Sequence, residues 1–221
     1  IYRWLDGEPA TPENVSNPVG LATRLADFLV ALYRIDPSGG PPPGEHNFFR
    51  GAPPATYDSE TRSAIASLHG EIDTGGAQEV WDLACRAAWH GPPVWIHGDV
   101  TASNLLVDHG RLSAVIDFGG MAVGDPACDL TMAWTFFSAE GREAFRAHLQ
   151  MDDAAWARGR GWALWKALIT LIETVETGRD DEPGLRFGWR HSARHIIEEV
   201  VAELRDAPGD IPFSAPPGHL P

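Results

Sequence analysis

The segment from Val94 to Gly120 constrains the fold of this chain more than any other part of its sequence. His97 stands two positions before Asp99 in a His-Gly-Asp run. Asn104 follows Asp99 by five positions, and Asp117 follows it by eighteen, within an Asp-Phe-Gly run. His97, Gly98, Asp99, Asn104 and Asp117 thus occur at fixed spacings, and apolar residues flank them. This pattern is typical of a catalytic loop.

The flanking residues predict a β-hairpin that brings two of these side chains together. Apolar residues at 105–107 and 112–116 are separated by a turn at 108–111, Asp-His-Gly-Arg. Such a pattern is typical of two short antiparallel strands joined by a turn. Asn104 precedes the first strand and Asp117 ends the second, so we expect both side chains at the same end of the hairpin.

These residue types suit the transfer of a phosphoryl group from a nucleotide. Magnesium prefers oxygen ligands and keeps several waters, so one or two protein side chains suffice to hold it. We expect Asn104 and Asp117 to bind Mg²⁺, and Asp99 to take the proton of an acceptor hydroxyl. His97 could be a ligand or an acid, but we expect it to be buried and to hold the loop by hydrogen bonds.

At these residues the sequence resembles the aminoglycoside phosphotransferase family, relatives of choline kinase and distant relatives of protein kinases. The resemblance rests on three runs: His97 to Leu106, Ile116 to Phe118, and Gly124 to Leu130, which reads Gly-Asp-Pro-Ala-Cys-Asp-Leu. Gly98 favours the small-molecule kinases, because protein kinases usually carry arginine there.

The resemblance implies a role for each matching residue. Asp99 would be the catalytic base, Asn104 and Asp117 would bind magnesium, and Asp129 would be structural. We expect Asp125 to be the N-cap of a helix, because a proline follows it at the first helical position.

The resemblance also implies a mainly α-helical fold with a small catalytic β-hairpin, like the large C-terminal lobe of a kinase. The N-terminal β-rich lobe of such enzymes, with its phosphate-covering loop and strand lysine, is missing from the sequence. The one lysine, Lys166, lies in a tryptophan-rich helical stretch. The loop at 39–44 is rich in proline, which supplies no backbone N–H to bind phosphate.

This interpretation divides the chain into three parts. We expect residues 1–17 to be a hinge or linker from the missing lobe, because Tyr2 to Glu8 resembles the point where family members leave the hinge. Residues 18–206 would form the kinase-like lobe. Residues 207–221, which contain five prolines, would be an extended tail.

Apolar periodicity predicts helices near 18–35, 58–70, 76–89, 126–138, 140–149, 152–177 and 189–205. The stretch from Trp156 to Ile172 could line a sugar-binding cleft, but we expect it to form core. Residues 47–51, Asn-Phe-Phe-Arg-Gly, could pack near the catalytic loop or cap the fold, and the sequence leaves both alternatives open.

The formal net charge of −14, from 17 basic and 31 acidic residues, argues against a nucleic-acid partner. It is compatible with a cationic acceptor. No apolar run approaches the ~18 residues of a membrane span. Cys85 and Cys128 are far apart in sequence, so we expect free thiols and a reducing, cytoplasmic location. His191 and His195 lie one helical turn apart, without a third metal ligand nearby.

Acidic residues gather at the end of the predicted helix at 152–177. Glu173 and Glu176 could pair with ammonium groups of an acceptor, and residues 180–182 are acidic as well. The alternative is a solvated helix end, and carboxylates there are mildly unfavourable because of the helix dipole.

The sequence therefore predicts a small-molecule O-phosphotransferase. It would use Mg²⁺ and ATP or GTP to phosphorylate a hydroxyl of an aminoglycoside-like or other small acceptor. An alternative is a catalytically silent lobe or pseudokinase that acts as a binding module. A third possibility is a metal-dependent hydrolase that uses His97, Asp99 and Asp117. The acceptor, the donor base, the oligomeric state and a role in antibiotic resistance or metabolism stay open.

Overall fold

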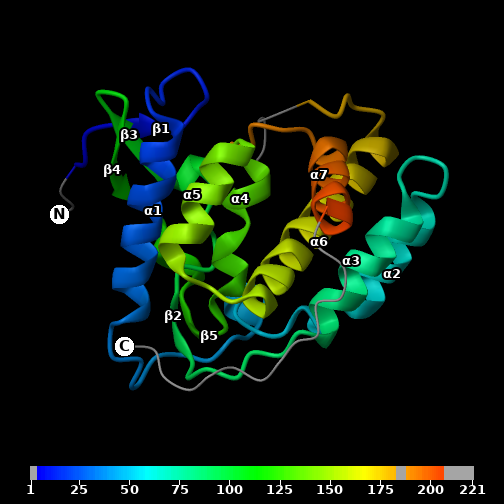
Figure 1. Cartoon of the computed structure of the whole chain (residues 1–221), viewed down its shortest axis with the longest axis horizontal. Coiled ribbons are helices and arrows are strands. Elements are labelled where there is room, and N and C mark those ends of the chain that lie inside the picture. Colours follow the sequence, from blue (N-terminus) through cyan, green and yellow to red (C-terminus); the bar gives the residue numbers. More distant parts are fainter. Residues whose placement is uncertain (1–3, 183–187, 207–221) are drawn as a thin grey trace.

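The structure is a computed structural model that describes residues 4–182 and 188–206, and these form a mainly helical fold with two small sheets (Figure 1). The helices are α1 (Pro18–Tyr33), α2 (Asp58–Ser67), α3 (Thr74–Arg86), α4 (Met132–Thr135), α5 (Ala139–Leu149), α6 (Asp153–Thr177) and α7 (Ala193–Asp206). The strands are β1 (Glu8–Pro9), β2 (Val94–Ile96), β3 (Leu105–Asp108), β4 (Arg111–Val115) and β5 (Ala122–Gly124). The predicted fold class, mainly α with a small hairpin, is confirmed.

The predicted hairpin forms from β3 and β4, which pair antiparallel with Leu105 opposite Val115 and Asp108 opposite Arg111. β1 adds to the other edge of β3. The second sheet pairs β2 with β5, antiparallel, on either side of the hairpin in the sequence. The two sheets therefore fix both ends of the segment that carries the motif.

The long helix α6 forms the centre of the helical part, packed against α3, α7 and the 3₁₀ turn Pro126–Leu130. Trp156, Trp162 and Trp165 on α6 are buried, as expected for a core helix. Gly161 lets α3 approach closely, because a Cβ at that position would lie 2.3 Å from the Ala84 Cβ. In Figure 1, α1 and α5 lie on the hairpin side of α6, whereas α2 and α3 lie on its far side.

Two predicted helices differ from the observed ones. The helix expected at 126–138 is a 3₁₀ turn followed by the short α4. The helical stretch ends before Ser138, because the Ser138 side chain accepts from the Gly141 N–H and so caps the start of α5. The helix expected at 189–205 begins instead at Ala193. There the carboxylate of Asp181 accepts hydrogen bonds from the N–H groups of residues 193 and 194.

Some predictions fall on parts of the chain that the structure does not describe. The proline-rich tail at 207–221 lies outside the described residues, as do residues 1–3 of the predicted hinge. Within residues 4–182 and 188–206, no helix combines the length and apolar character needed to cross a bilayer.

Candidate active site

The loop that carries Asp99 is held from inside by His97. This histidine is fully buried, and its Nδ1 accepts a hydrogen bond from the Asp99 N–H over 3.2 Å. Its Nε2 therefore carries the proton, and it donates to the carbonyl of Ile116 over 3.0 Å. Both ring nitrogens are therefore engaged, one by the Asp99 N–H and the other by the carbonyl of Ile116, just after β4.

Asp129 holds the backbone of the same loop. Its buried carboxylate accepts hydrogen bonds from the N–H groups of His97 (3.0 Å) and Gly98 (2.8 Å). Gly98 has a φ of +78°, and a Cβ there would lie 2.2 Å from the carbonyl oxygen of Gly120. Only glycine fits this position, so the glycine of the motif is explained by the close approach of two backbone segments.

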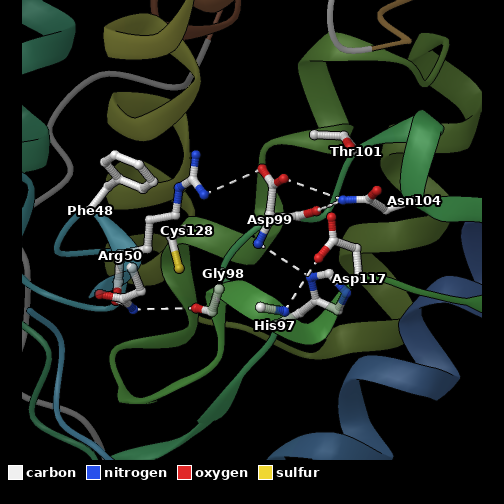
Figure 2. Close-up of polar contacts among 12 residues, drawn as sticks. Phe48, Arg50, His97, Gly98, Asp99, Thr101, Asn104, Asp117 and Cys128 are labelled. Carbon is white, nitrogen blue, oxygen red and sulfur yellow. Dashed lines mark hydrogen bonds and ion pairs between the residues drawn. The ribbon is translucent and has the colours of Figure 1, made fainter. Parts of the chain in front are cut away.

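The hairpin brings Asn104 and Asp117 to the same side of Asp99 (Figure 2). The Asn104 amide donates to the Asp99 carbonyl over 2.9 Å and to the Asp99 Oδ2 over 3.3 Å. Because its nitrogen faces Asp99, its Oδ1 is left for another partner. Asp117 is exposed, two residues past the end of β4, in a left-handed conformation with φ of 63°.

An amide oxygen and a carboxylate, completed by waters and phosphate oxygens, fit the preferences of Mg²⁺. Among the described residues, no group of three or more His, Cys, Asp or Glu side chains could hold a metal ion by itself. A metal with an all-protein ligand set, such as structural zinc, therefore has no equivalent site in that part of the chain.

Two cations lie on the other side of Asp99, and the sequence did not predict either of them. Arg50 Nη1 lies 3.5 Å from Asp99 Oδ1, and Lys166 Nζ lies 3.6 Å from the same oxygen. Arg50 belongs to the loop at 47–51, so that loop packs beside the catalytic loop. Asn47 anchors it by donating to the carbonyls of Arg50 (2.8 Å) and Gly120 (3.3 Å).

A pocket opens beside Asp99 on the side of these cations. It is lined by Arg50, Gly98, Asp99, Val100, Cys128, Thr131, Trp162, Trp165 and Lys166. The ring of Trp165 stacks on Tyr57 with centroids 4.3 Å apart, which gives the pocket a rigid aromatic wall. Burial lowers the pKa of Lys166 to about 8, an effect that Asp99 opposes.

Asp125 is an N-cap, as predicted, but it also has a partner that the sequence did not indicate. Its Oδ1 accepts from the Ala127 N–H over 3.0 Å, and its Oδ2 lies 2.6 Å from Arg158 Nε. Both side chains are buried. This ion pair joins α6 to the segment that follows β5.

The acidic residues near the end of α6 do not line the pocket beside Asp99. Glu173 lies seven residues beyond Lys166, which is about 10 Å along the helix. Glu176 is exposed, and Asp181 caps α7. His191 and His195 lie with ring centroids 4.5 Å apart, and burial lowers the pKa of His191 to about 4.

Comparison with known proteins bears on the family and the fold of the chain. The sequence profile of the family described as "Phosphotransferase enzyme family" matches residues 1–162. No curated protein sequence matches the chain.

Three solved structures illustrate the likeness of the fold. A mutant of aminoglycoside 2′-phosphotransferase-IIIa in complex with GDP has a TM-score of 0.59 at 17% identity, over 93% of this chain and 70% of that one. A thermostable mutant of aminoglycoside phosphotransferase APH(4)-Ia has a TM-score of 0.54 at 18% identity, over 93% and 72%. The macrolide 2′-phosphotransferase of Brachybacterium faecium has a TM-score of 0.51 at 19% identity, over 95% and 70%. The fold is therefore that of the kinase-like C-terminal lobe.

Proposed function

Because the chain belongs to the phosphotransferase enzyme family, we propose that it transfers the γ-phosphate of ATP or GTP to a hydroxyl of a small molecule. The observation that carries the proposal is the position of Asp99. Its Oδ2 accepts from Asn104, beside Asp117 (Figure 2), while its Oδ1 contacts Arg50 and Lys166, which line the pocket. A base that bridges a metal site and an acceptor site is the arrangement that in-line phosphoryl transfer needs.

In this proposal each side chain has a distinct task. Asp99 accepts the proton of the acceptor hydroxyl, and the hydrogen bond from Asn104 orients its carboxylate. Arg50 and Lys166 form ion pairs with Oδ1 of the Asp99 carboxylate. When bound at Asn104 and Asp117, Mg²⁺ neutralises the charge on the nucleotide phosphates.

The exchange Asp99→Asn tests the role of the base. We expect it to lower kcat by about 10²- to 10⁴-fold, because general base catalysis contributes that much, while the fold is kept. Phosphate transfer is measured as nucleoside diphosphate release with a panel of acceptors. Asp108→Asn, at the exposed end of β3, is the matched control and should leave kcat unchanged. A fully active Asp99→Asn protein contradicts the proposal.

Mn²⁺ is a paramagnetic probe for the proposed metal site. With ADP present, Asn104→Ala and Asp117→Ala should each weaken Mn²⁺ binding at least tenfold, measured by electron paramagnetic resonance. The Asp108→Asn control should bind Mn²⁺ as the wild-type protein does. Equal binding by all four proteins removes Asn104 and Asp117 from the site.

A silent binding module is the second candidate, because Asp99 is in contact with two cations. Binding of Mn²⁺ and ADP without phosphate transfer to any acceptor would favour it. A hydrolase that uses His97 as a ligand is disfavoured, since both ring nitrogens are engaged.

Glu173 and Glu176 stay candidates for contact with an acceptor amine. If they make such a contact, exchange of both to Gln raises the KM of an aminoglycoside and leaves the nucleotide KM unchanged. Equal effects on both constants contradict this assignment.

A further inference from the structure

We infer that the pocket beside Asp99 binds an anionic group of the acceptor, a carboxylate or a phosphate, through Arg50 and Lys166. The inference rests on the proposed function and names the chemical class of its acceptor. That class differs from the polycationic acceptor with which the net charge of the chain is compatible.

The charges that line the pocket support an anion. Arg50 and Lys166 are cationic, and Asp99 is the one carboxylate among the described lining residues. Lys166 is buried, with 7% of its surface exposed. A polycation in this pocket would meet two positive charges, whereas an anion would pair with both.

The distances leave room for a further partner of Arg50. Its contact with Asp99 is 3.5 Å, longer than the 2.7–2.9 Å of a charge-assisted hydrogen bond. The guanidinium group has five N–H donors in a planar fork, which matches the two oxygens of a carboxylate or phosphate. Arg50 therefore lines the pocket without a short hydrogen bond to Asp99, and its N–H donors can bind a ligand.

Trp162 supplies an independent observation. Its indole ring lines the pocket and is 3% exposed, and its Nε1 has no hydrogen-bond partner among the described residues. The neighbouring Trp165 differs, because its Nε1 donates to Glu60 over 2.7 Å. A buried N–H donor without an acceptor is rare in folded proteins.

The position of the two cations separates this subsite from the metal side. Arg50 and Lys166 both contact Oδ1 of Asp99, whereas Asn104 contacts Oδ2. Figure 2 shows Arg50 on one side of Asp99 and Asn104 with Asp117 on the other. The phosphates of the nucleotide belong with the magnesium ligands, so the anion on the opposite side is assigned to the acceptor.

The test uses three small probes that share a phenol ring and differ in charge: 4-hydroxyphenylacetate, its neutral amide 4-hydroxyphenylacetamide, and the cation 4-hydroxybenzylamine. Each is titrated into the full chain at pH 7, with tryptophan fluorescence as the signal. We expect the acid to bind at least tenfold more tightly than the amide, and the amine to bind most weakly. Equal binding, tighter binding of the amine, or no binding of the acid overturns the inference.

Variants connect the binding to the named residues. Arg50→Gln and Lys166→Gln should each weaken binding of the acid at least tenfold and change binding of the amide less than threefold. Arg111→Gln, an exposed arginine on β4, is the matched control and should behave like the wild-type protein. Arg50→Lys keeps the charge and should restore part of the affinity, which separates loss of charge from loss of fold.

Two further measurements test separate points. The first asks whether the bound anion belongs to the acceptor or to the nucleotide, and the second asks whether anion binding is independent of phosphoryl transfer. The Mg²⁺ complex of a non-hydrolysable ATP analogue should leave the affinity for the acid within about threefold, because donor and acceptor occupy different sides of Asp99. Competition between them overturns the assignment to the acceptor. Asp99→Asn should lower the rate of phosphoryl transfer by about 10²- to 10⁴-fold, yet bind the acid at least as tightly as the wild-type protein. If the wild-type protein transfers no phosphate, the proposed function is wrong, but binding of the acid still tests the anion site.

Discussion

Lys166 is a buried lysine whose charge changes just above neutral pH. Burial lowers its pKa to about 8, Asp99 opposes the shift, and Arg50 adds to it. Burial raises the pKa of the nearby Cys128 thiol, so that group stays neutral in this range. Lys166 is cationic below pH 8 and neutral above it. Anion binding should therefore weaken as the pH rises, with an increase of about tenfold in the Kd of 4-hydroxyphenylacetate from pH 7 to pH 9.

Fluorescence titrations across that range measure the effect. In Lys166→Gln the dependence on pH should disappear, because the lysine that loses its charge near pH 8 is gone. In Arg50→Gln it should persist at lower affinity, since Lys166 is still present. A Kd that stays constant from pH 7 to pH 9 in the wild-type protein shows that the charge of Lys166 plays no part in binding.

The residues of the catalytic loop could be predicted from the sequence, but its two cations could not. Asp99, Asn104 and Asp117 lie within nineteen positions of one another, and a hairpin with a recognisable turn brings them together. Arg50 lies 49 positions before Asp99 and Lys166 lies 67 after it. Lys166 reaches Asp99 through the packing of α6 against the segment after β5, and Arg50 reaches it through the loop that Asn47 anchors. The single lysine of the chain was the one available signal.

At the scale of one element, the loop between β2 and β3 depends on Gly98. A Cβ at this position meets the Gly120 carbonyl oxygen at 2.2 Å, and φ is +78°. Gly39 has the same φ of +78°, but a Cβ added there would meet no atom within 4 Å, so Gly39→Ala is a matched control for backbone strain alone. We expect Gly98→Ala to lower the free energy of unfolding by about 1–3 kcal/mol more than Gly39→Ala does.

Urea denaturation of both variants measures this difference. Gly98→Ala should also lower the rate of phosphate transfer, because the displaced loop carries Asp99, while Gly39→Ala should keep the rate. Equal destabilisation by the two substitutions shows that the close approach of Gly98 to the Gly120 carbonyl does not exclude a side chain at position 98.

Element boundaries followed the sequence where local caps fix them and departed where tertiary contacts do. Asn17 caps α1 at the predicted start, and Asp152 caps α6 in the same way. The start of α7 combines a local cap, the Ser192 Oγ that accepts from the His195 N–H, with the carboxylate of Asp181, which lies twelve residues before Ala193. Periodicity predicts that a helix exists, but it carries no information about a cap that arrives from a distant loop.

At the scale of the whole molecule, Glu203 joins α7 to the rest of the helical part. Its carboxylate accepts hydrogen bonds from Trp156 Nε1 over 2.7 Å and from Arg160 Nη2 over 3.0 Å, both on α6. It also accepts from Trp134 Nε1 on α4 and lies 3.4 Å from Arg142 Nη1 on α5. One carboxylate thus holds three helices against α7.

Glu203→Gln removes the charge and keeps the shape of the side chain. Removal of one partner from a largely buried ion-pair network is strongly destabilising, so we expect a loss of about 2–4 kcal/mol in the free energy of unfolding. Glu198→Gln, exposed on the same helix, should change it by less than about 0.5 kcal/mol. Urea denaturation at pH 7 measures the free energy of unfolding of both variants. Equal losses would mean that the contacts of Glu203 with α4, α5 and α6 do not stabilise the fold.

The pH dependence of that difference follows from the pKa of Glu203. Burial raises the pKa, but Arg160 and the indole N–H groups outweigh burial, and the pKa lies below its ordinary value. A lowered pKa in the folded state stabilises the protein at neutral pH, and this contribution is lost as the pH falls through the folded value. The gap in stability between the wild-type protein and Glu203→Gln should therefore narrow in acid. A gap that stays constant from pH 7 down to acid unfolding would mean that the network acts through shape rather than charge.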